Sequence, residues 1–253
     1  MTFWDHLEEL RGCLLRIVIA VLLCAVAAFA LRDPLFDIVL APKRDSFITY
    51  RLLERLVGTL PPFKVEMVNI ELAQQFLIHV KVSLWAALLA VSPYILFVLM
   101  RFVSPALYTG ERKLTLRAVG AGYLLFLCGM LLAYFVIFPL TVRFLATYQV
   151  SADVPNVVSL GSYVSAFLML LLLMGVVFEL PVACWLLGRL GLLDVDAMRR
   201  YRRHAIVAIV ILAAVITPTG DVFTLMVVAL PVYLLYEVGI RVVARSAAPY
   251  KQR

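Results

Sequence analysis

Long, uninterrupted apolar runs dominate this 253-residue sequence. A membrane-spanning helix needs about 20 mainly apolar residues, and lipid admits only helices or closed barrels because backbone polar groups must be satisfied internally. The runs are long and continuous, which favours helices over barrel strands. The sequence therefore predicts an all-α polytopic membrane protein with six transmembrane helices. The predicted helices cover residues 13–31, 76–100, 118–138, 163–187, 205–216 and 224–240.

The composition also favours a membrane protein over a soluble domain. Hydrophobic residues make up 64% of the chain and charged residues 15%, against about half and about a quarter in ordinary soluble domains. The formal net charge is +7, but the basic residues lie in short stretches between the apolar runs. We therefore expect these charges to meet the lipid bilayer and no nucleic acid.

The last two predicted helices are short. Residues 205–216 supply only 12 apolar residues. At about 1.5 Å per residue they span about 18 Å, against a hydrocarbon core of about 30 Å. The sixth helix contains Pro231 and Glu237, which interrupt its apolar stretch. Either the fifth helix borrows flanking residues or the bilayer thins around it.

The positions of Lys and Arg predict the orientation. Fifteen of them fall on the side that carries both termini, seven fall on the opposite side, and Lys81 lies within a helix. Because cytoplasmic loops are enriched in positive charge, both termini are predicted to be cytoplasmic. Residues 1–253 are predicted to form a single integral membrane domain. Its flanking parts are a cytoplasmic amphipathic arm at 1–12, a long outer loop at 32–75 and a basic cytoplasmic tail at 241–253.

Two segments outside the apolar runs show helical periodicity. In the arm, Phe3, Leu7, Leu10 and Leu14 form one apolar stripe, which indicates an interfacial helix. In the outer loop, apolar residues at helical spacing predict an extracytoplasmic amphipathic helix within residues 47–57. These residues are Ile48, Leu52, Leu53 and Leu56.

The sequence offers no support for catalysis, a metal site or a cofactor. No Gly is followed by Lys, so a phosphate-binding P-loop is absent. The four cysteines form no C-x-x-C pair, and the three histidines are isolated from one another and from cysteine. No G-x-S-x-G nucleophile motif occurs. We expect a protein that is not an enzyme.

One carboxylate lies inside a predicted span. Glu179 falls within residues 163–187, where a charge costs about 2.5 to 3.5 kcal/mol on insertion scales. Such a residue usually faces a cavity or a partner, although a protonated or internally hydrogen-bonded glutamate that only packs is the alternative. Pro181 follows closely and loosens the local backbone.

Two further acids lie among basic residues at the predicted cytoplasmic surface. On a helical arm, Glu9 has Gly12 and Cys13 at i+3 and i+4, whereas Glu8 has Arg11 at i+3. Glu9 therefore lacks a basic partner on its own helix face. Glu111 has Leu114 and Thr115 at those spacings, so it also lacks a basic partner there. The two residues that directly follow it are basic. The alternative for both is an ordinary solvated surface acid.

Several motifs, taken in order, resemble one family. The arm reads HLEELR at residues 6–11, similar to the HLxELR signature at the start of the twin-arginine translocase subunit TatC. Residues 102–108 read FVSPALY and precede Glu111 and Arg112, similar to that family's FxxPAL and ER in its first cytoplasmic loop. Later matches follow in the family's order and spacing. They are AYF at 133–135, FPL at 138–140, FELPV at 178–182, and Thr217-Pro218 with Asp221.

The resemblance implies a fold and a function. Members of the family have six transmembrane helices in a cupped arrangement, short fifth and sixth helices, and both termini in the cytoplasm. The resemblance implies the core receptor of a translocase in the cytoplasmic (inner) membrane, which binds twin-arginine signal peptides. Its implied partners are single-span proteins of the TatA and TatB type, in an oligomeric complex that exports folded proteins. Energy would come from the proton gradient.

The resemblance also assigns roles to individual residues. Glu9 and Glu111 match the acids of the signal-peptide site, and Phe102 matches its loop aromatic. A carboxylate accepts two hydrogen bonds from the rigid donor fork of an arginine, so two separated acids distinguish two arginines from two lysines. The remaining assignments are Leu7 and Arg11 in the signal-peptide site, Glu179 as an intramembrane polar site, and Pro42 and Asp221 in the outer loops.

The sequence departs from the family in three places. The arm reads Arg11-Gly12-Cys13 where relatives tend to carry further basic residues. The turn at 217–221 is one residue longer than the usual TPPD, and residues 43–70 extend the first outer loop. These departures indicate a divergent member.

A different function class is a proton-coupled secondary transporter of a small solute. In that case Glu179, Glu237 and Asp221 would form a proton relay. Many such transporters contain an inverted repeat and a matched pair of broken helices, and neither is visible in this sequence. The translocase interpretation is therefore preferred.

Overall fold

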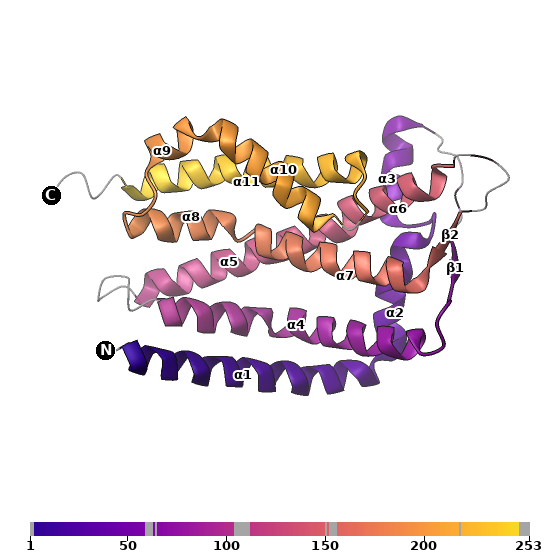
Figure 1. Cartoon of the computed structure of the whole chain (residues 1–253), viewed down its shortest axis with the longest axis horizontal. Coiled ribbons are helices and arrows are strands. Elements are labelled where there is room, and N and C mark those ends of the chain that lie inside the picture. The colour runs from indigo at the N-terminus through magenta and orange to yellow at the C-terminus, as the bar shows by residue number, and fades with distance from the viewer. Residues whose placement is uncertain are drawn as a thin grey trace. The chain divides into compact units, whose positions relative to one another are not determined.

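The computed structural model describes residues 3–58, 63, 65–103, 112–149, 151, 156–217 and 219–247. These residues are mostly helical (Figure 1). The α-helices are α1 Phe3–Ala30, α2 Arg32–Leu40, α3 Ile48–Val57, α4 Gln74–Val103, α5 Arg112–Leu132, α6 Phe138–Thr147, α7 Leu160–Val177, α8 Leu180–Arg189, α9 Val195–Arg200, α10 Arg202–Ile216 and α11 Val222–Ala247. A 3-10 turn, η1, covers Ala41–Lys43, and a π-helical turn, η3, covers Ala133–Ile137.

Five helical stretches in the described part of the chain are long and apolar enough to cross a membrane. Each overlaps one of the six predicted spans, which confirms a helical membrane protein with several spans. The stretches are Arg11–Ala30, Gln74–Val98, Val119–Thr147, Leu160–Arg189 and Val222–Arg245.

The last two predicted helices differ from each other in the structure. The fifth span corresponds to α10, which has only 15 residues and is about 22 Å long at about 1.5 Å per residue. The prediction of a short sixth helix is wrong, because α11 has 26 residues. Pro231 lies inside α11 without ending it, and the helix continues past the apolar run through Arg241 and Arg245.

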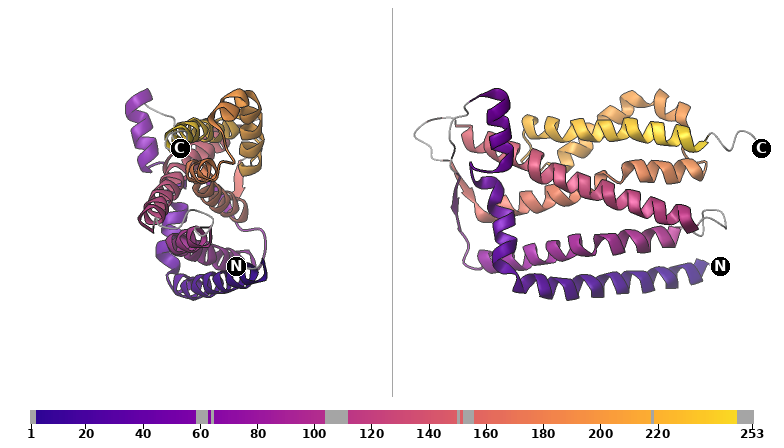
Figure 2. Two further views of the ribbon diagram at one scale, coloured as in Figure 1. Left: turned by 90° about the vertical axis from the view of Figure 1, so that its left-hand side faces the viewer. Right: turned by 180° about the vertical axis from the view of Figure 1, so that it is seen from behind.

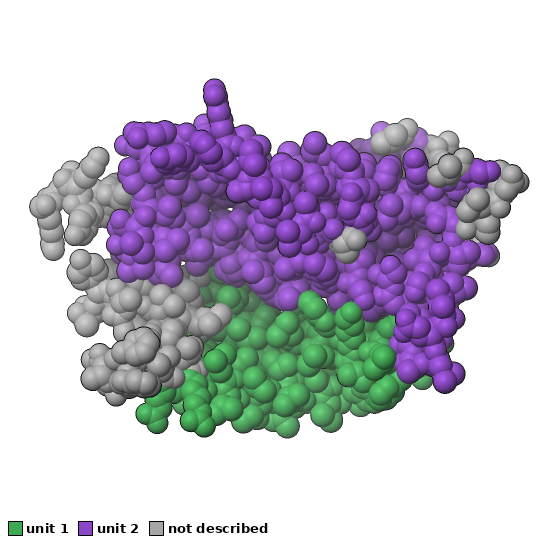
Figure 3. Space-filling model, viewed as in Figure 1, with its two compact units in different colours: residues 1–36, 75–124 green, residues 37–74, 125–253 purple. Residues whose placement is uncertain are grey.

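The chain forms two compact units, coloured separately in Figure 3. The first consists of residues 1–36 and 75–124. In this unit α1 and α4 lie side by side (Figures 1 and 2). Their contact is built on the buried side chains of Val21, Ala87 and Val91.

The second unit consists of residues 37–74 and 125–253. Its helices α8 and α11 pack closely through small residues. A Cβ on Gly239 would lie 3.1 Å from the Cys184 sulfur, and one on Gly188 would lie 3.0 Å from a Val243 methyl carbon. Small residues at such a contact let two helix backbones approach each other in the absence of a hydrophobic driving force from water.

The second unit also contains a feature that the sequence did not predict. Strands β1 Glu66–Val68 and β2 Val157–Ser159 form a parallel pair. Gln74 lies beside this pair and donates a side-chain hydrogen bond to the Ser159 hydroxyl at 3.5 Å. A three-residue strand carries too little alternation to be distinguished from a loop by sequence pattern.

Candidate functional site

The residues predicted to bind a signal peptide fall largely beyond what the structure describes. Glu111 lies outside the described residues. Leu7 and Glu9 belong to α1, and Phe102 belongs to α4, but their side chains are outside the described part. Arg11 is exposed on α1. The assembly of this site therefore stays a prediction.

Glu179 lies at a break between two helices. The stretch Leu160–Arg189 is long and apolar enough to cross a membrane, yet within it α7 ends at Val177 and α8 begins at Leu180. The Glu179 N–H donates to the carbonyl of Val176 at 3.0 Å, a three-residue step that tightens the last turn of α7. Pro181 has no N–H to continue the helical ladder, which explains why the break occurs here.

The carboxyl of Glu179 is incompletely satisfied. Its Oε1 atom is buried and has no hydrogen-bond partner among the described residues. A buried polar atom without a partner costs about 1 to 3 kcal/mol. The predicted intramembrane polar residue is thus placed at a helix break, with one oxygen available to a proton or to an incoming donor.

The end of α7, next to the helix break, packs tightly against α5. A Cβ on Gly129 would lie 2.5 Å from the Met174 carbonyl oxygen and 2.8 Å from the Phe178 ring. One turn earlier on α7, a Cβ on Gly175 would lie 2.7 Å from the ring of Phe126. The two glycines let α5 and α7 approach closely just before Glu179.

Pro42 is fully buried and lies in the connection between the first two predicted spans. Its carbonyl accepts a hydrogen bond from the Tyr50 hydroxyl at 2.8 Å, and the same hydroxyl lies 3.0 Å from the Pro139 carbonyl. Burial raises the pKa of Tyr50, and the nearby Arg143 cation partly opposes this shift. Tyr163 donates to the Val39 carbonyl at 3.2 Å. These bonds fasten residues 39–50 to the spanning helices.

Asp221 caps the start of α11. Its Oδ1 accepts a hydrogen bond from the Thr224 N–H at 2.7 Å, the geometry of a helix N-cap. The Thr219 hydroxyl donates to the other carboxylate oxygen at 2.6 Å. Between them Gly220 has a φ of 61°, a left-handed conformation that glycine adopts without strain. The extra residue of this turn is therefore accommodated by glycine.

The Asp221 cap leads to an expected pH dependence. Partial burial raises the pKa of this carboxyl, but hydrogen bonds from Thr219 and the Thr224 backbone outweigh that effect, so the net pKa lies below its ordinary value. A lowered folded-state pKa means that the carboxylate stabilises the fold above the unfolded pKa of about 3.9 and loses this contribution as pH falls further. Asp221→Ala should lower the free energy of unfolding by about 1 kcal/mol at pH 7.

Thermal unfolding in detergent between pH 7 and pH 3 measures this effect. The difference between the native chain and Asp221→Ala should shrink as pH falls below about 4. Asp221→Asn retains a neutral cap acceptor, so its difference from Asp221→Ala should not change with pH. A constant difference between the native chain and Asp221→Ala would contradict the assigned ionised cap.

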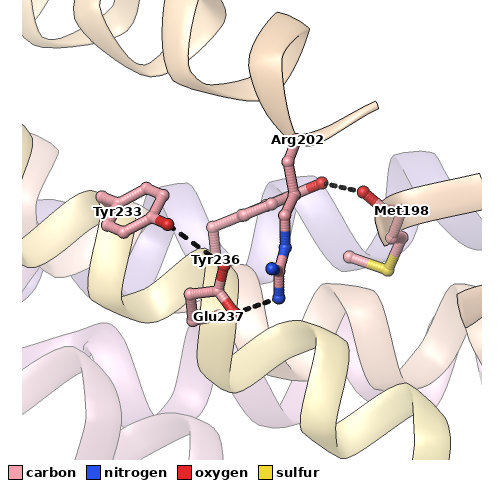
Figure 4. A network of polar contacts seen from close by, with 5 residues as sticks. All are labelled: Met198, Arg202, Tyr233, Tyr236 and Glu237. Carbon is pink, nitrogen blue, oxygen red and sulfur yellow. Dashed lines mark hydrogen bonds and ion pairs between the residues drawn. The ribbon is translucent and has the colours of Figure 1, made fainter. Parts of the chain in front are cut away.

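Glu237 lies in a polar network near the end of α11 (Figure 4). Its Oε2 pairs with the Arg202 guanidinium at 2.8 Å, and its Oε1 accepts a hydrogen bond from the Tyr233 hydroxyl at 3.2 Å. The Tyr236 hydroxyl donates to the Met198 carbonyl at 2.8 Å. Both oxygens of Glu237 are therefore engaged, and they join α10 to α11, while the Tyr236 hydroxyl links α11 to α9.

Sequence patterns alone missed most of this network. Tyr233 and Glu237 are four residues apart on one helix, and this spacing predicts that their side chains are neighbours. Arg202 is 35 residues from Glu237, so this ion pair required the tertiary structure. Since the carboxylates of Glu237 and Asp221 are both held by structural contacts, neither provides the free carboxylate that a proton relay through them would need.

No group of three or more His, Cys, Asp or Glu side chains within the described residues could hold a metal ion. The candidate site is therefore defined by carboxylates and by the helices that carry them. In the described part, the helix break at Glu179 is its best-defined element.

Comparisons with known proteins agree in pointing to one family. Residues 5–231 match the family model of TatC, the Sec-independent protein translocase protein. The chain is 31% identical over 250 residues to the TatC protein of Blattabacterium sp. subsp. Periplaneta americana, covering 95% of this chain and 94% of that protein. It is 36% identical over 252 residues to TatC of Deinococcus radiodurans, covering 98% and 88%. The crystal structure of the twin arginine translocase receptor TatC matches with a TM-score of 0.77 at 29% identity, over 96% of this chain and 99% of that one.

Proposed function

Because the chain belongs to the TatC family of Sec-independent protein translocase proteins, we propose that it is the receptor that binds twin-arginine signal peptides. It is a membrane protein of the Tat protein-transport system and not an enzyme. The observation that carries the proposal is the family match over residues 5–231, which spans all three acids assigned from the motifs. Those acids are Glu9, Glu111 and Glu179.

The binding site would form on the cytoplasmic side. Glu9 and Glu111 each accept the donor fork of one guanidinium of the arginine pair. Leu7, Arg11 and Phe102 belong to the same site. The surrounding basic surface repels cationic ligands that do not engage both acids, so the pair of carboxylates also provides selectivity.

The proposal includes a topology and partners. All six predicted helices cross the cytoplasmic membrane, residues 1–253 form one integral membrane domain, and both termini lie in the cytoplasm. The receptor recruits single-span partners of the TatA and TatB type into an oligomeric complex. This complex exports folded proteins at the expense of the proton gradient.

Glu179 has a separate role in this proposal. The buried Oε1 of Glu179 has no partner among the described residues and lies at a helix break inside a span, so it offers an acceptor to a polar group that enters from the membrane. Glu179 would position either the apolar segment of a signal peptide or the helix of an assembling partner. An intramembrane acid is costly unless such a use offsets its burial.

Binding of signal peptides to the purified chain in lipid nanodiscs tests the proposal. A fluorescent twin-arginine peptide should bind with an affinity about tenfold or more above that of the same peptide with two lysines. Two lost bidentate contacts at about 0.5 to 1.5 kcal/mol each account for such a ratio. The lysine peptide keeps the charge and the apolar segment, so it is the matched control. Equal dissociation constants for the two peptides would contradict the receptor assignment.

A further inference from the structure

Helix α3 presents an apolar stripe that no described residue covers. Ile48, Leu52 and Leu56 follow one another at intervals of four residues, and their side chains are 63%, 58% and 76% exposed. At 3.6 residues per turn these positions lie on one face of the helix. A stripe of three large aliphatic side chains on a ten-residue helix is unusual for a surface in contact with water.

Side chains beside and opposite the stripe fasten α3 to the spanning helices of its own unit. Tyr50 is fully buried and bonds to the Pro139 carbonyl. The Thr49 hydroxyl donates to the Phe135 carbonyl, and the Phe47 ring, just before α3, stacks on Phe135 with 5.9 Å between centroids. The orientation of the stripe is therefore fixed by packing, with its apolar side chains directed away from the protein.

These attachments place α3 at the end of an apolar run. The run at residues 118–138 has 21 residues and is about 31 Å long as a helix, which matches a hydrocarbon core of about 30 Å. Phe135 lies near the end of this run and Pro139 directly follows it, and although the helical stretch itself continues to Thr147, Arg143 is the first charged residue beyond the run. The contacts of α3 therefore fall where the uncharged part of the third span ends. Exposed side chains on the same span continue the apolar surface towards α3. They are Leu131, Phe135 and Val136.

The direction of α3 fits this position. Figures 1 and 2 show α3 crossing the direction of α6, α7 and α11, which belong to the same unit. A helix that lies across spanning helices runs roughly in the plane of the bilayer. An amphipathic helix in that plane buries its apolar face about 5 to 10 Å into the boundary between headgroups and acyl chains.

Basic side chains accompany the stripe. Arg51 and Arg55 are exposed and lie four residues apart on the flank next to Ile48. In that position their guanidinium groups reach the level of the lipid phosphates while the aliphatic stripe lies deeper. The charge pattern therefore fits a membrane surface with anionic lipids better than a purely apolar protein partner.

We propose that α3 is an interfacial membrane anchor, with Ile48, Leu52 and Leu56 inserted at the acyl-chain boundary and Arg51 and Arg55 bound to anionic lipid phosphates. The anchor holds the outer segment flat against the bilayer around the end of the third span. This proposal does not depend on signal-peptide binding, because it concerns only the contacts of α3 with lipid.

Fluorescence quenching in nanodiscs tests the depth of α3. The native Cys13, Cys24, Cys128 and Cys184 are replaced by alanine, and a single cysteine is introduced by Leu52→Cys or, as the matched control on the polar face, by Glu54→Cys. Each variant carries an NBD fluorophore in a nanodisc with one copy of the chain. Quenching is measured with a lipid that bears a nitroxide near its headgroup and, separately, with aqueous iodide.

The expected results differ for the two positions. The label at position 52 should be quenched more strongly by the lipid nitroxide and less strongly by iodide than the label at position 54. Strong iodide quenching at both positions would overturn the proposal. Weak lipid quenching at position 52, with iodide protection that develops only when two copies share a nanodisc, would also overturn it and would assign the stripe to a second copy of this chain.

A second experiment isolates the arginines. Nanodiscs that contain mixed phosphatidylcholine and phosphatidylglycerol are used with the native chain and with Arg51→Gln/Arg55→Gln. After detergent extraction, the double variant should retain fewer phosphatidylglycerol molecules than the native chain. Each basic residue at an anionic surface strengthens local binding by about fivefold. The same substitutions at Arg199 and Arg200, exposed on α9, are the control for total charge. An equal loss in both double variants would contradict a specific role for α3.

Discussion

Replacement of both Glu9 and Glu111 by glutamine is expected to lower the affinity for a twin-arginine signal peptide by about 100-fold. Glutamine keeps the shape of the side chain but removes the charge, so each guanidinium loses a charge-assisted pair of hydrogen bonds. Hydrogen bonds to charged groups contribute about 1.5 to 3 kcal/mol each, and every 1.4 kcal/mol changes the dissociation constant tenfold. Titration of a labelled peptide into the chain in nanodiscs measures the change.

Glu8→Gln is the matched control for this prediction. Glu8 is exposed on the same helix, and its spacing to Arg11 gives it a local basic partner. Glu8→Gln removes one negative charge from the arm, as Glu9→Gln does. A loss of affinity as large as that of the double variant would therefore indicate general electrostatic attraction. Unchanged affinity in Glu9→Gln/Glu111→Gln would contradict the assigned site. The double variant should also bind the two-lysine peptide and the two-arginine peptide with nearly equal affinity.

The second large effect is expected from Gly129→Ala. The new Cβ would lie 2.5 Å from the carbonyl oxygen of Met174, a backbone atom, and 2.8 Å from the Phe178 ring. Since a helix backbone cannot turn aside as a side chain can, α5 and α7 must separate. Overpacking of this kind costs about 1 to 3 kcal/mol and occasionally more. We expect a loss near 3 kcal/mol, measured by thermal unfolding of the chain in detergent.

Gly120→Ala provides the control on the same helix. A Cβ at Gly120 meets no described atom within 4 Å, and alanine favours a helix over glycine by about 0.5 to 1 kcal/mol. This variant should be as stable as the native chain or slightly more stable. Equal stability of Gly120→Ala and Gly129→Ala would mean that the close approach of α5 and α7 does not determine stability.

The helices could be predicted from sequence because long apolar runs in lipid leave the backbone no other solution. The ends of the helices could not be predicted in this way, because a helix can continue through charged residues after its apolar run has ended. Arg241 and Arg245 extend α11 well beyond its apolar stretch. The structure has a helix, α3, at Ile48–Val57, where an amphipathic helix was predicted from apolar spacing, which is a local property. Its extracytoplasmic position stays a prediction.

Local signals also predicted parts of the site. Glu179 was recognisable because a charge inside an apolar run is costly, and Pro181 marked the break that the structure places beside it. Asp221 was assigned to an outer turn, but its cap on α11 depends on the turn geometry around Gly220. Tyr50 and Arg202 gave no signal in the sequence. Their partners lie 89 and 35 residues away, so only the folded chain brings them together.

Export of a folded reporter protein tests the central proposal most directly. Cells that lack their own TatC receive this chain together with its native single-span partners, and the reporter carries a twin-arginine signal. We expect export that disappears when the arginine pair is replaced by two lysines. Absence of export although all components are stably inserted in the membrane, or export that is indifferent to the lysine replacement, would contradict a twin-arginine receptor.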